Sequence, residues 1–328
     1  MRLVGPLALG LCVLVGAVSC STDSRSEDTS TGIQSDVADA APGTDPVTTL
    51  AAARPYGYEV LTETFVDTSR QTPAGASTPA APERTLETRI YLPDATGSLP
   101  LIVFAHGISG HPDKFTGLFA TWAEAGYVVV APVFPLTNDQ TPGSALNFTD
   151  AANQPADMSF VLDEVLELSA AAEGPLAGKI DGGRLGAAGL SLGGLTTYTM
   201  ALSECCRDDR AVAVEIFAGT TPNMGEGEEF TAVEGVPTLV FHGTGDPWIP
   251  YQTGGEAFEL LNPPAYLVTL EGAGHSEPFE DSESPFDDFV EAISLAFWDQ
   301  FLLTSEENAE VLFEQVEAFD SATITAAG

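Results

Sequence analysis

The amino-acid sequence predicts an α/β fold with a mainly parallel central sheet that is covered by helices on both faces. Strand and helix signals alternate from about residue 58 to residue 303, as in chains whose strands are joined by crossover helices. Residues 101–105 and 127–131 are continuous apolar runs, which is typical of strands buried on both faces. At residues 184–197 a strand signal passes through Ser191 directly into helical composition.

The individual elements follow from hydrophobic periodicity and from Gly and Pro punctuation. Residues 58–67 and 84–92 alternate as half-buried strands, and a Pro/Ala/Ser loop joins them. The further strands are expected at residues 101–105, 127–131, 185–189, 211–218, 236–241 and 266–270. Helices are expected at residues 112–125, from residue 154 to about 168, at 195–203, at 253–261 and at 286–303, the last of which closes the fold.

The N-terminal segment predicts export. Arg2 precedes an apolar run at residues 3–18, and small residues lead to Cys20, as in a secretory signal. A cysteine in this place resembles the lipobox of bacterial lipoproteins, although Ala17 stands where Leu is usual. We therefore divide the chain into a signal peptide (1–19), a flexible acidic tether (20–53) and a catalytic domain (54–328). We expect the mature protein to be a cell-surface lipoprotein that is lipidated at Cys20. Ordinary secretion and an uncleaved membrane anchor are the alternatives.

The charge balance restricts the partners. The 328 residues include 48 acidic and 11 basic side chains, for a formal net charge of −37. Nucleic acid needs Lys and Arg to replace its counterions, so this class of ligand is excluded, and anionic substrates are disfavoured. We expect a solvated acidic surface, a monomer, and contact with a membrane only through the lipid at Cys20.

The cysteines add little about chemistry. Cys12 leaves with the signal, which leaves Cys205 and Cys206 in the mature domain besides Cys20. This adjacent pair could form a vicinal disulfide or remain as two small thiols, and we favour a disulfide with a structural role. The chain has four histidines, none of them spaced with these cysteines as metal ligands would be, so no metal is expected.

The stretch around Ser191 predicts a nucleophile. Gly189, Ser191 and Gly193 fit G-x-S-x-G, a sharp strand-to-helix turn that exposes a serine at the end of a sheet. The glycines are needed because the strained turn must approach its neighbours without a Cβ in the way. The pattern alone is weak in a chain with 32 glycines.

The partners of this serine are expected later in the chain. A serine hydroxyl needs a base and an acid that orients the base, in the order Ser, Asp or Glu, His. His275 lies in a glycine-rich loop after the last expected strand, and Asp246 follows the preceding strand. Together, Ser191, Asp246 and His275 predict a catalytic triad. His242 stands at a strand end and is not favoured as the base.

An oxyanion hole is expected from two backbone N–H groups. One belongs to Leu192, directly after the nucleophile, and the other to Ile108, in the loop after the 101–105 strand. His106 precedes the nucleophile in the chain and is expected to support this loop rather than to act as a base.

The substrate pocket is expected to be open. Residues 219–235, the usual place of a lid, are too few for a helical cap. Trp248 is a candidate apolar wall, with a plain core tryptophan as the alternative. His111 is a candidate lining residue or a helix-start residue, and Phe134 is a candidate on the leaving-group side.

The motifs together resemble those of the α/β-hydrolase superfamily over about residues 58–303, in particular its dienelactone-hydrolase-like and cutinase-type, polyester-hydrolase-like branch. The matching blocks are residues 100–107, 125–132, 189–193, 241–246 and 274–275. True dienelactone hydrolases use a cysteine nucleophile, and this chain has Ser191. The resemblance implies a cofactor-free serine carboxylesterase for neutral small esters or polyesters. A serine amidase or peptidase and a non-catalytic surface binding protein of the same fold are the alternatives.

Overall fold

The computed structural model describes residues 55–75, 78–140, 148–204, 207–222, 230–303 and 309–328. Contacts divide the chain into two units, Met1–Gly43 and Thr44–Gly328, and the fold below belongs to the second. The expected signal peptide, the whole expected tether with Cys20, and the Cys205–Cys206 pair lie outside the described residues and stay predictions. Among the described helices, none combines the length and the apolar character needed to cross a membrane.

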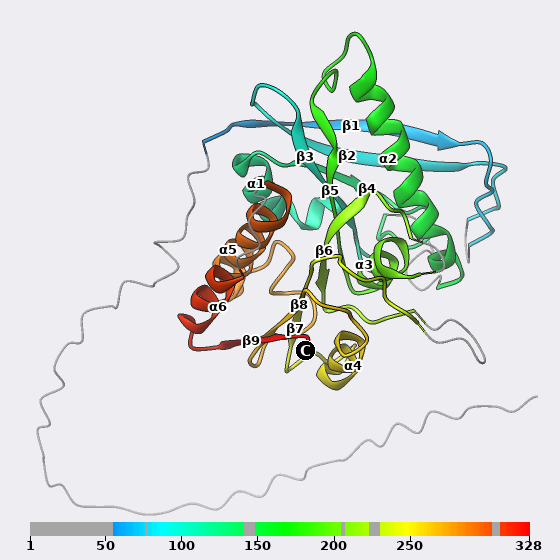
Figure 1. Ribbon diagram of the computed structural model, residues 1–328. Coiled ribbons are helices and arrows are strands. Elements are labelled where there is room, and N and C mark those ends of the chain that lie inside the picture. Colours follow the sequence, from blue (N-terminus) through cyan, green and yellow to red (C-terminus); the bar gives the residue numbers. More distant parts are fainter. Residues whose placement is uncertain (1–54, 76–77, 141–147, 205–206, 223–229, 304–308) are drawn as a thin grey trace, which may run out of the picture. The chain divides into compact units, whose positions relative to one another are not determined.

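The described residues form a nine-stranded sheet in the order β1-β2-β4-β3-β5-β6-β7-β8-β9. Its central strands, from β4 through β3 to β8, run parallel, whereas β1, β2 and β9 are antiparallel to their neighbours. This confirms the predicted mainly parallel sheet (Figure 1). The strands are β1 Tyr58–Asp67, β2 Arg84–Pro93, β3 Leu99–Ala105, β4 Val128–Pro132, β5 Ile180–Leu190, β6 Ala211–Phe217, β7 Thr238–Gly243, β8 Ala265–Leu270 and β9 Ala322–Ala326.

Helices cover both faces of the sheet. In Figure 1, α1, α5 and α6 lie on one side and α2, α3 and α4 on the other. Between β6 and β7 no helix occurs in the described residues, in keeping with the predicted lack of a large lid, while residues 223–229 of this connection are outside the description. The helices are α1 Thr116–Ala125, α2 Gln154–Ala170, α3 Leu192–Thr197, α4 Tyr251–Phe258, α5 Asp287–Trp298 and α6 Glu310–Glu317.

Each face of the sheet has its own hydrophobic core, because successive side chains of a strand point to opposite faces. In β3, Leu101 and Val103 belong to the core under α2 and α4, whereas Ile102 and Phe104 belong to the core under α1 and α5. All four side chains are fully buried. This explains why the strand appears in the sequence as an unbroken apolar run.

The C-terminal end differs from the prediction of one long closing helix. The helix α5 ends at Trp298 and continues as a π-helical turn, Asp299–Leu303, and α6 and β9 follow. The strand β9 adds to the edge of the sheet by antiparallel pairing with β8. It is short and largely exposed, so its sequence lacks the apolar run that marks the central strands.

A buried ion-pair network joins β2 to the start of α2. Arg84 Nη1 lies 2.8 Å from Asp150 Oδ1, and its Nε donates to Asp157 Oδ1 at 2.7 Å. All three side chains are fully buried. Arg70 adds a second cation at 2.8 Å from Asp157. Because each buried charge has a partner, the network connects the outer strands to the helix that follows β4.

Removing the cation from this network should destabilise the fold. We expect Arg84→Met to lower the free energy of unfolding by about 3 kcal/mol, because it leaves the buried Asp150 carboxylate without its cation and Asp157 with Arg70 alone. Urea denaturation measures the change. Arg184→Met is the control: it breaks a half-exposed pair with Asp181 and should cost about 1 kcal/mol or less. Equal losses in the two variants would contradict the importance of the buried network.

Candidate active site

Ser191 occupies a strained turn between β5 and α3. Its φ of 58° and ψ of −115° are rarely adopted by a residue with a side chain. The turn is held from both sides, because Ser191 N–H donates to Phe217 O at 2.9 Å and Ser191 O accepts from Leu195 N–H at 3.0 Å. The serine side chain is thereby presented at the carboxyl end of the parallel strands.

The flanking glycines allow this turn for a steric reason. A Cβ on Gly193 would lie 1.9 Å from Ala105 O, and a Cβ on Gly189 would lie 2.3 Å from Gly193 O. Both contacts are with backbone, which cannot move aside cheaply. The close approach of the turn to β3 and β5 therefore requires glycine at both positions.

Asp246 and His275 are joined by a short hydrogen bond. His275 Nδ1 lies 2.6 Å from Asp246 Oδ2, and a carboxylate only accepts, so Nδ1 carries the proton. Asp246 Oδ1 accepts from the N–H groups of Trp248 at 2.8 Å and Ile249 at 2.9 Å. The Asp246 side chain is fully buried, whereas that of His275 is 13% exposed. In the neutral ring the lone pair that can accept a proton is then on Nε2.

The two loops that carry this pair are fastened to each other. Gly245 N–H donates to Ala273 O at 2.9 Å, and Gly272 N–H donates to Thr244 Oγ1 at 2.8 Å. A Cβ on Gly243 would lie 2.2 Å from Ala273 O. These contacts at the ends of β7 and β8 fix the two loops relative to each other, and the hydrogen bond to Asp246 orients the imidazole.

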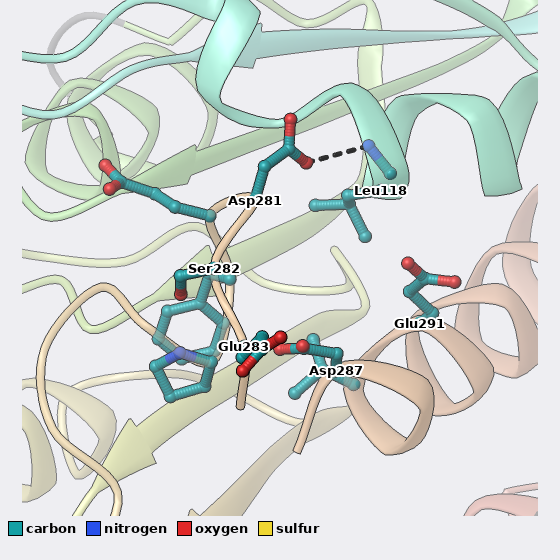
Figure 2. A pocket seen from close by; sticks show the side chains of 11 residues that line it. Leu118, Asp281, Ser282, Glu283, Asp287 and Glu291 are labelled. Carbon is teal, nitrogen blue, oxygen red and sulfur yellow. Dashed lines mark hydrogen bonds between the residues drawn. The ribbon is translucent and has the colours of Figure 1, made fainter. Parts of the chain in front are cut away.

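The loop after His275 is also anchored at its far end. The Asp281 carboxylate accepts hydrogen bonds from the N–H groups of Thr116 and Gly117, both at 2.9 Å. It therefore caps the N-terminus of α1, although it is far from this helix in the sequence. Figure 2 shows this carboxylate hydrogen-bonded to the first turn of α1, beside a small pocket rich in acidic side chains. The anchoring restricts the chain between His275 and α5.

The loop after β3 has a peptide group of fixed orientation. His106 Nδ1 donates to Gly107 O at 2.7 Å, and its Nε2 accepts from Phe134 N–H at 3.1 Å. Burial lowers the pKa of His106 to about 4, so the ring is neutral. In a trans peptide the N–H points opposite to the carbonyl, so the bond to Gly107 O turns the N–H of Ile108 the other way.

A cavity of about 600 Å³ brings the principal predicted residues together. Ser191, His275, Ile108, Leu192 and Trp248 all line it, and Asp246 lies behind His275. Trp248 is 77% exposed, so it is a wall at the rim and not a core residue.

Two predicted pocket residues lie elsewhere. His111 is buried and its Nδ1 accepts from Asp113 N–H at 3.2 Å, so it caps the short helical turn Pro112–Lys114. Phe134 is fully buried and packs on His106, with ring centroids 4.9 Å apart. Neither is among the residues that line the cavity.

Other lining residues were missed by the sequence reasoning. Lys114 and Glu280 bring charges to the cavity, and Leu195, Thr220, Ile249 and Ser276 complete its walls. Burial raises the pKa of Glu280. Lys114 is one of two lysines in the chain, which is the one signal that could have drawn attention to it. The others stand in no recognisable motif.

The fold is that of an α/β hydrolase. Residues 60–232, more than half of the 328, match the family model described as chlorophyllase. The chain belongs to the chlorophyllase family. Residues 218–292 also match a model described as TAP-like protein. A search of curated proteins found no match. The finer resemblance to dienelactone-hydrolase-like and cutinase-type enzymes stays a prediction.

The glycine after Ser191 should be intolerant of any side chain. We expect Gly193→Ala to lower the free energy of unfolding by about 2–3 kcal/mol, because its Cβ would overlap the backbone of β3. Gly255→Ala is the control, since a Cβ there meets nothing within 4 Å and alanine favours the helix. Thermal or urea unfolding of both variants tests the contact, and an unchanged Gly193→Ala protein would contradict it.

Proposed function

We propose that this protein is a serine carboxylic-ester hydrolase that works through an acyl-enzyme. One observation carries the proposal: the buried Asp246 carboxylate holds the Nδ1 proton of His275 in the cavity that also receives Ser191. The family supports a hydrolase. The assignment of the three residues to a triad is our inference from their geometry.

The mechanism follows from the roles that each group can take. His275 Nε2 removes the Ser191 proton as the hydroxyl attacks the ester carbonyl, and Asp246 stabilises the imidazolium that forms. The N–H groups of Ile108 and Leu192 bind the oxyanion. The alcohol leaves with the proton from His275. Water then attacks the acyl-enzyme with the same base, which releases the acid and restores Ser191.

The cavity favours an uncharged, hydrophobic ester. Trp248, Ile108, Leu195 and Ile249 give it apolar walls, and the open rim beside Trp248 leaves room for a bulky acyl group or a polymer end. The net charge of −37 repels anionic substrates. A family named for chlorophyllase makes chlorophyll one candidate for the test panel, beside acyl esters of increasing length and an insoluble polyester.

Loss of the nucleophile should abolish hydrolysis. We expect Ser191→Ala to lower kcat/KM for a short p-nitrophenyl ester by at least about a thousandfold, because no acyl-enzyme can form. Ser276→Ala is the matched control, since this serine lines the same cavity and has no role in the mechanism. Its activity should stay within about threefold of the parent.

A fluorophosphonate probe separates the rival functions. The parent and Ser276→Ala proteins should be labelled and Ser191→Ala should not, whereas a non-catalytic binding protein would stay unlabelled in all three. Faster turnover of p-nitroanilides than of matched esters would instead favour an amidase or peptidase. A folded Ser191→Ala protein that retains hydrolysis would overturn the proposal.

Trp248 should contribute to substrate size preference. We expect Trp248→Ala to lower kcat/KM for bulky acyl esters by about tenfold and for acetyl esters by less than about threefold, because only the larger group contacts the rim. The free energy of unfolding should change little, since the side chain is 77% exposed. Leu260→Ala, an exposed apolar residue outside the cavity lining, is the control. Equal losses for acetyl and bulky esters would contradict this role.

A further inference from the structure

A second histidine lies against the Asp246 carboxylate. His242, at the end of β7, is fully buried. Its Nε2 lies 2.9 Å from Ile249 O and 3.4 Å from Asp246 Oδ2, the same oxygen that accepts from His275. The mechanism above makes no use of this imidazole.

The contacts determine the protonation of the His242 ring. A carbonyl only accepts, so Nε2 must carry a hydrogen for the bond to Ile249 O. Within the described residues, Nδ1 is buried and has no hydrogen-bond partner. A proton there would be buried without an acceptor, at a cost in free energy. Burial also lowers the pKa of His242. The ring is therefore the neutral Nε2–H tautomer.

The helix α4 prevents the ring from moving away. A Cβ on Gly254 would lie 2.1 Å from His242 Nδ1, so glycine is required where α4 crosses the imidazole. Tyr251, in the first turn of α4, packs edge-on against the ring at 6.0 Å between centroids. The Tyr251 hydroxyl is in turn hydrogen-bonded to Thr269 Oγ1 on β8 at 2.7 Å.

We propose that His242 is a positioning residue, whose Nε2–H holds the 246–249 turn and limits how strongly Asp246 stabilises protonated His275. The proposal rests on the proposed function, in which Asp246 orients the base. Two sets of hydrogen bonds hold the turn. Asp246 Oδ1 accepts from the backbone N–H groups of Trp248 and Ile249, and Ile249 O accepts from His242 Nε2–H. The same His242 nitrogen lies 3.4 Å from the Asp246 oxygen that binds His275.

The sign of the effect follows from the approach of His242 to this oxygen. The N–H group of His242, whose nitrogen lies 3.4 Å from Oδ2, carries positive charge near the carboxylate and offsets part of the negative charge that His275 experiences. Removing it makes Asp246 a stronger partner for the imidazolium, so His275 loses its proton at higher pH. The carboxylate itself stays in place through its two backbone N–H bonds. The titratable groups around the His242 ring are Asp246 and His275 from the two loops and Tyr251 from α4.

Two amide variants provide a matched test. In His242→Gln the side-chain amide reaches the place of the lost Nε2 and donates there, whereas in His242→Asn it ends near the place of Nδ1 and does not. We expect the acid limb of the kcat/KM profile to move up by about half a pH unit or more in His242→Asn, with kcat lowered about tenfold. In His242→Gln both quantities should return towards the parent values.

Nuclear magnetic resonance of the histidine rings tests the inference without any substrate. In the folded parent protein the His242 nitrogens should show the neutral Nε2–H form throughout the pH range of activity. The His275 ring signal, identified by its absence in His275→Gln, should titrate at higher pH in His242→Asn than in the parent or in His242→Gln.

The outcomes separate this inference from the proposed function. A His242 ring with its hydrogen on Nδ1, or an unchanged His275 titration in folded His242→Asn, would overturn it even if Ser191→Ala is inactive. The tautomer is read in the parent protein, so the inference stays falsifiable if His242→Asn does not fold. Conversely, an active Ser191→Ala protein would refute the esterase mechanism, while the ring measurements would still decide the coupling between the two histidines.

Discussion

The close packing of the Ser191 turn against β3 is the constraint on which the site depends. Gly193 brings the start of α3 so near to Ala105 that no side chain fits between them. The turn can adopt its positive φ because the neighbouring backbone holds it in place, including β3, all of whose residues are buried. The same approach places the N–H of Leu192 and the loop that begins at His106 at one end of the sheet. The serine that we propose as nucleophile and the N–H groups that we propose as oxyanion donors are therefore positioned by the same close packing.

An acidic chain needs separate solutions for the carboxylates that it buries. Arg84 is surrounded by Asp150 and Asp157, so this group of charges is paired inside the fold. Glu215, on β6, has no such cation among the described residues: burial raises its pKa well above the usual value, and Ser294 Oγ lies 2.8 Å from its Oε2. Asp150 and Asp157 are stabilised inside the fold by ion pairs, whereas Glu215 is stabilised there by being protonated. Acidic side chains outside the core contribute to the negative charge of the surface.

The loops of the site are held mainly by backbone contacts. The Asp246 carboxylate accepts hydrogen bonds from two N–H groups of its own turn. Hydrogen bonds also join the His275 loop to the Asp246 loop, and Asp281 joins the chain that follows to α1. Such contacts depend little on the identity of the surrounding side chains. The rim of the cavity differs from these loops in that the side chain of Trp248 is largely exposed to solvent.

The sequence by itself determined the fold class, because its apolar runs and alternating periods report burial on one or both faces of a sheet. It also indicated Ser191, Asp246 and His275, since a turn, its glycines and an order along the chain are local properties. It did not reveal α6 and β9, because an exposed edge strand carries no apolar run.

Only the tertiary structure decided which side chains line the cavity. It placed Phe134 and His111 away from the cavity and brought Glu280 to it, because these positions depend on how loops far apart in the sequence meet. For the same reason it alone placed His242 against Asp246: a histidine at a strand end looks unremarkable in the sequence. Its significance arises from a distance of 3.4 Å that the packing of α4 on β7 maintains.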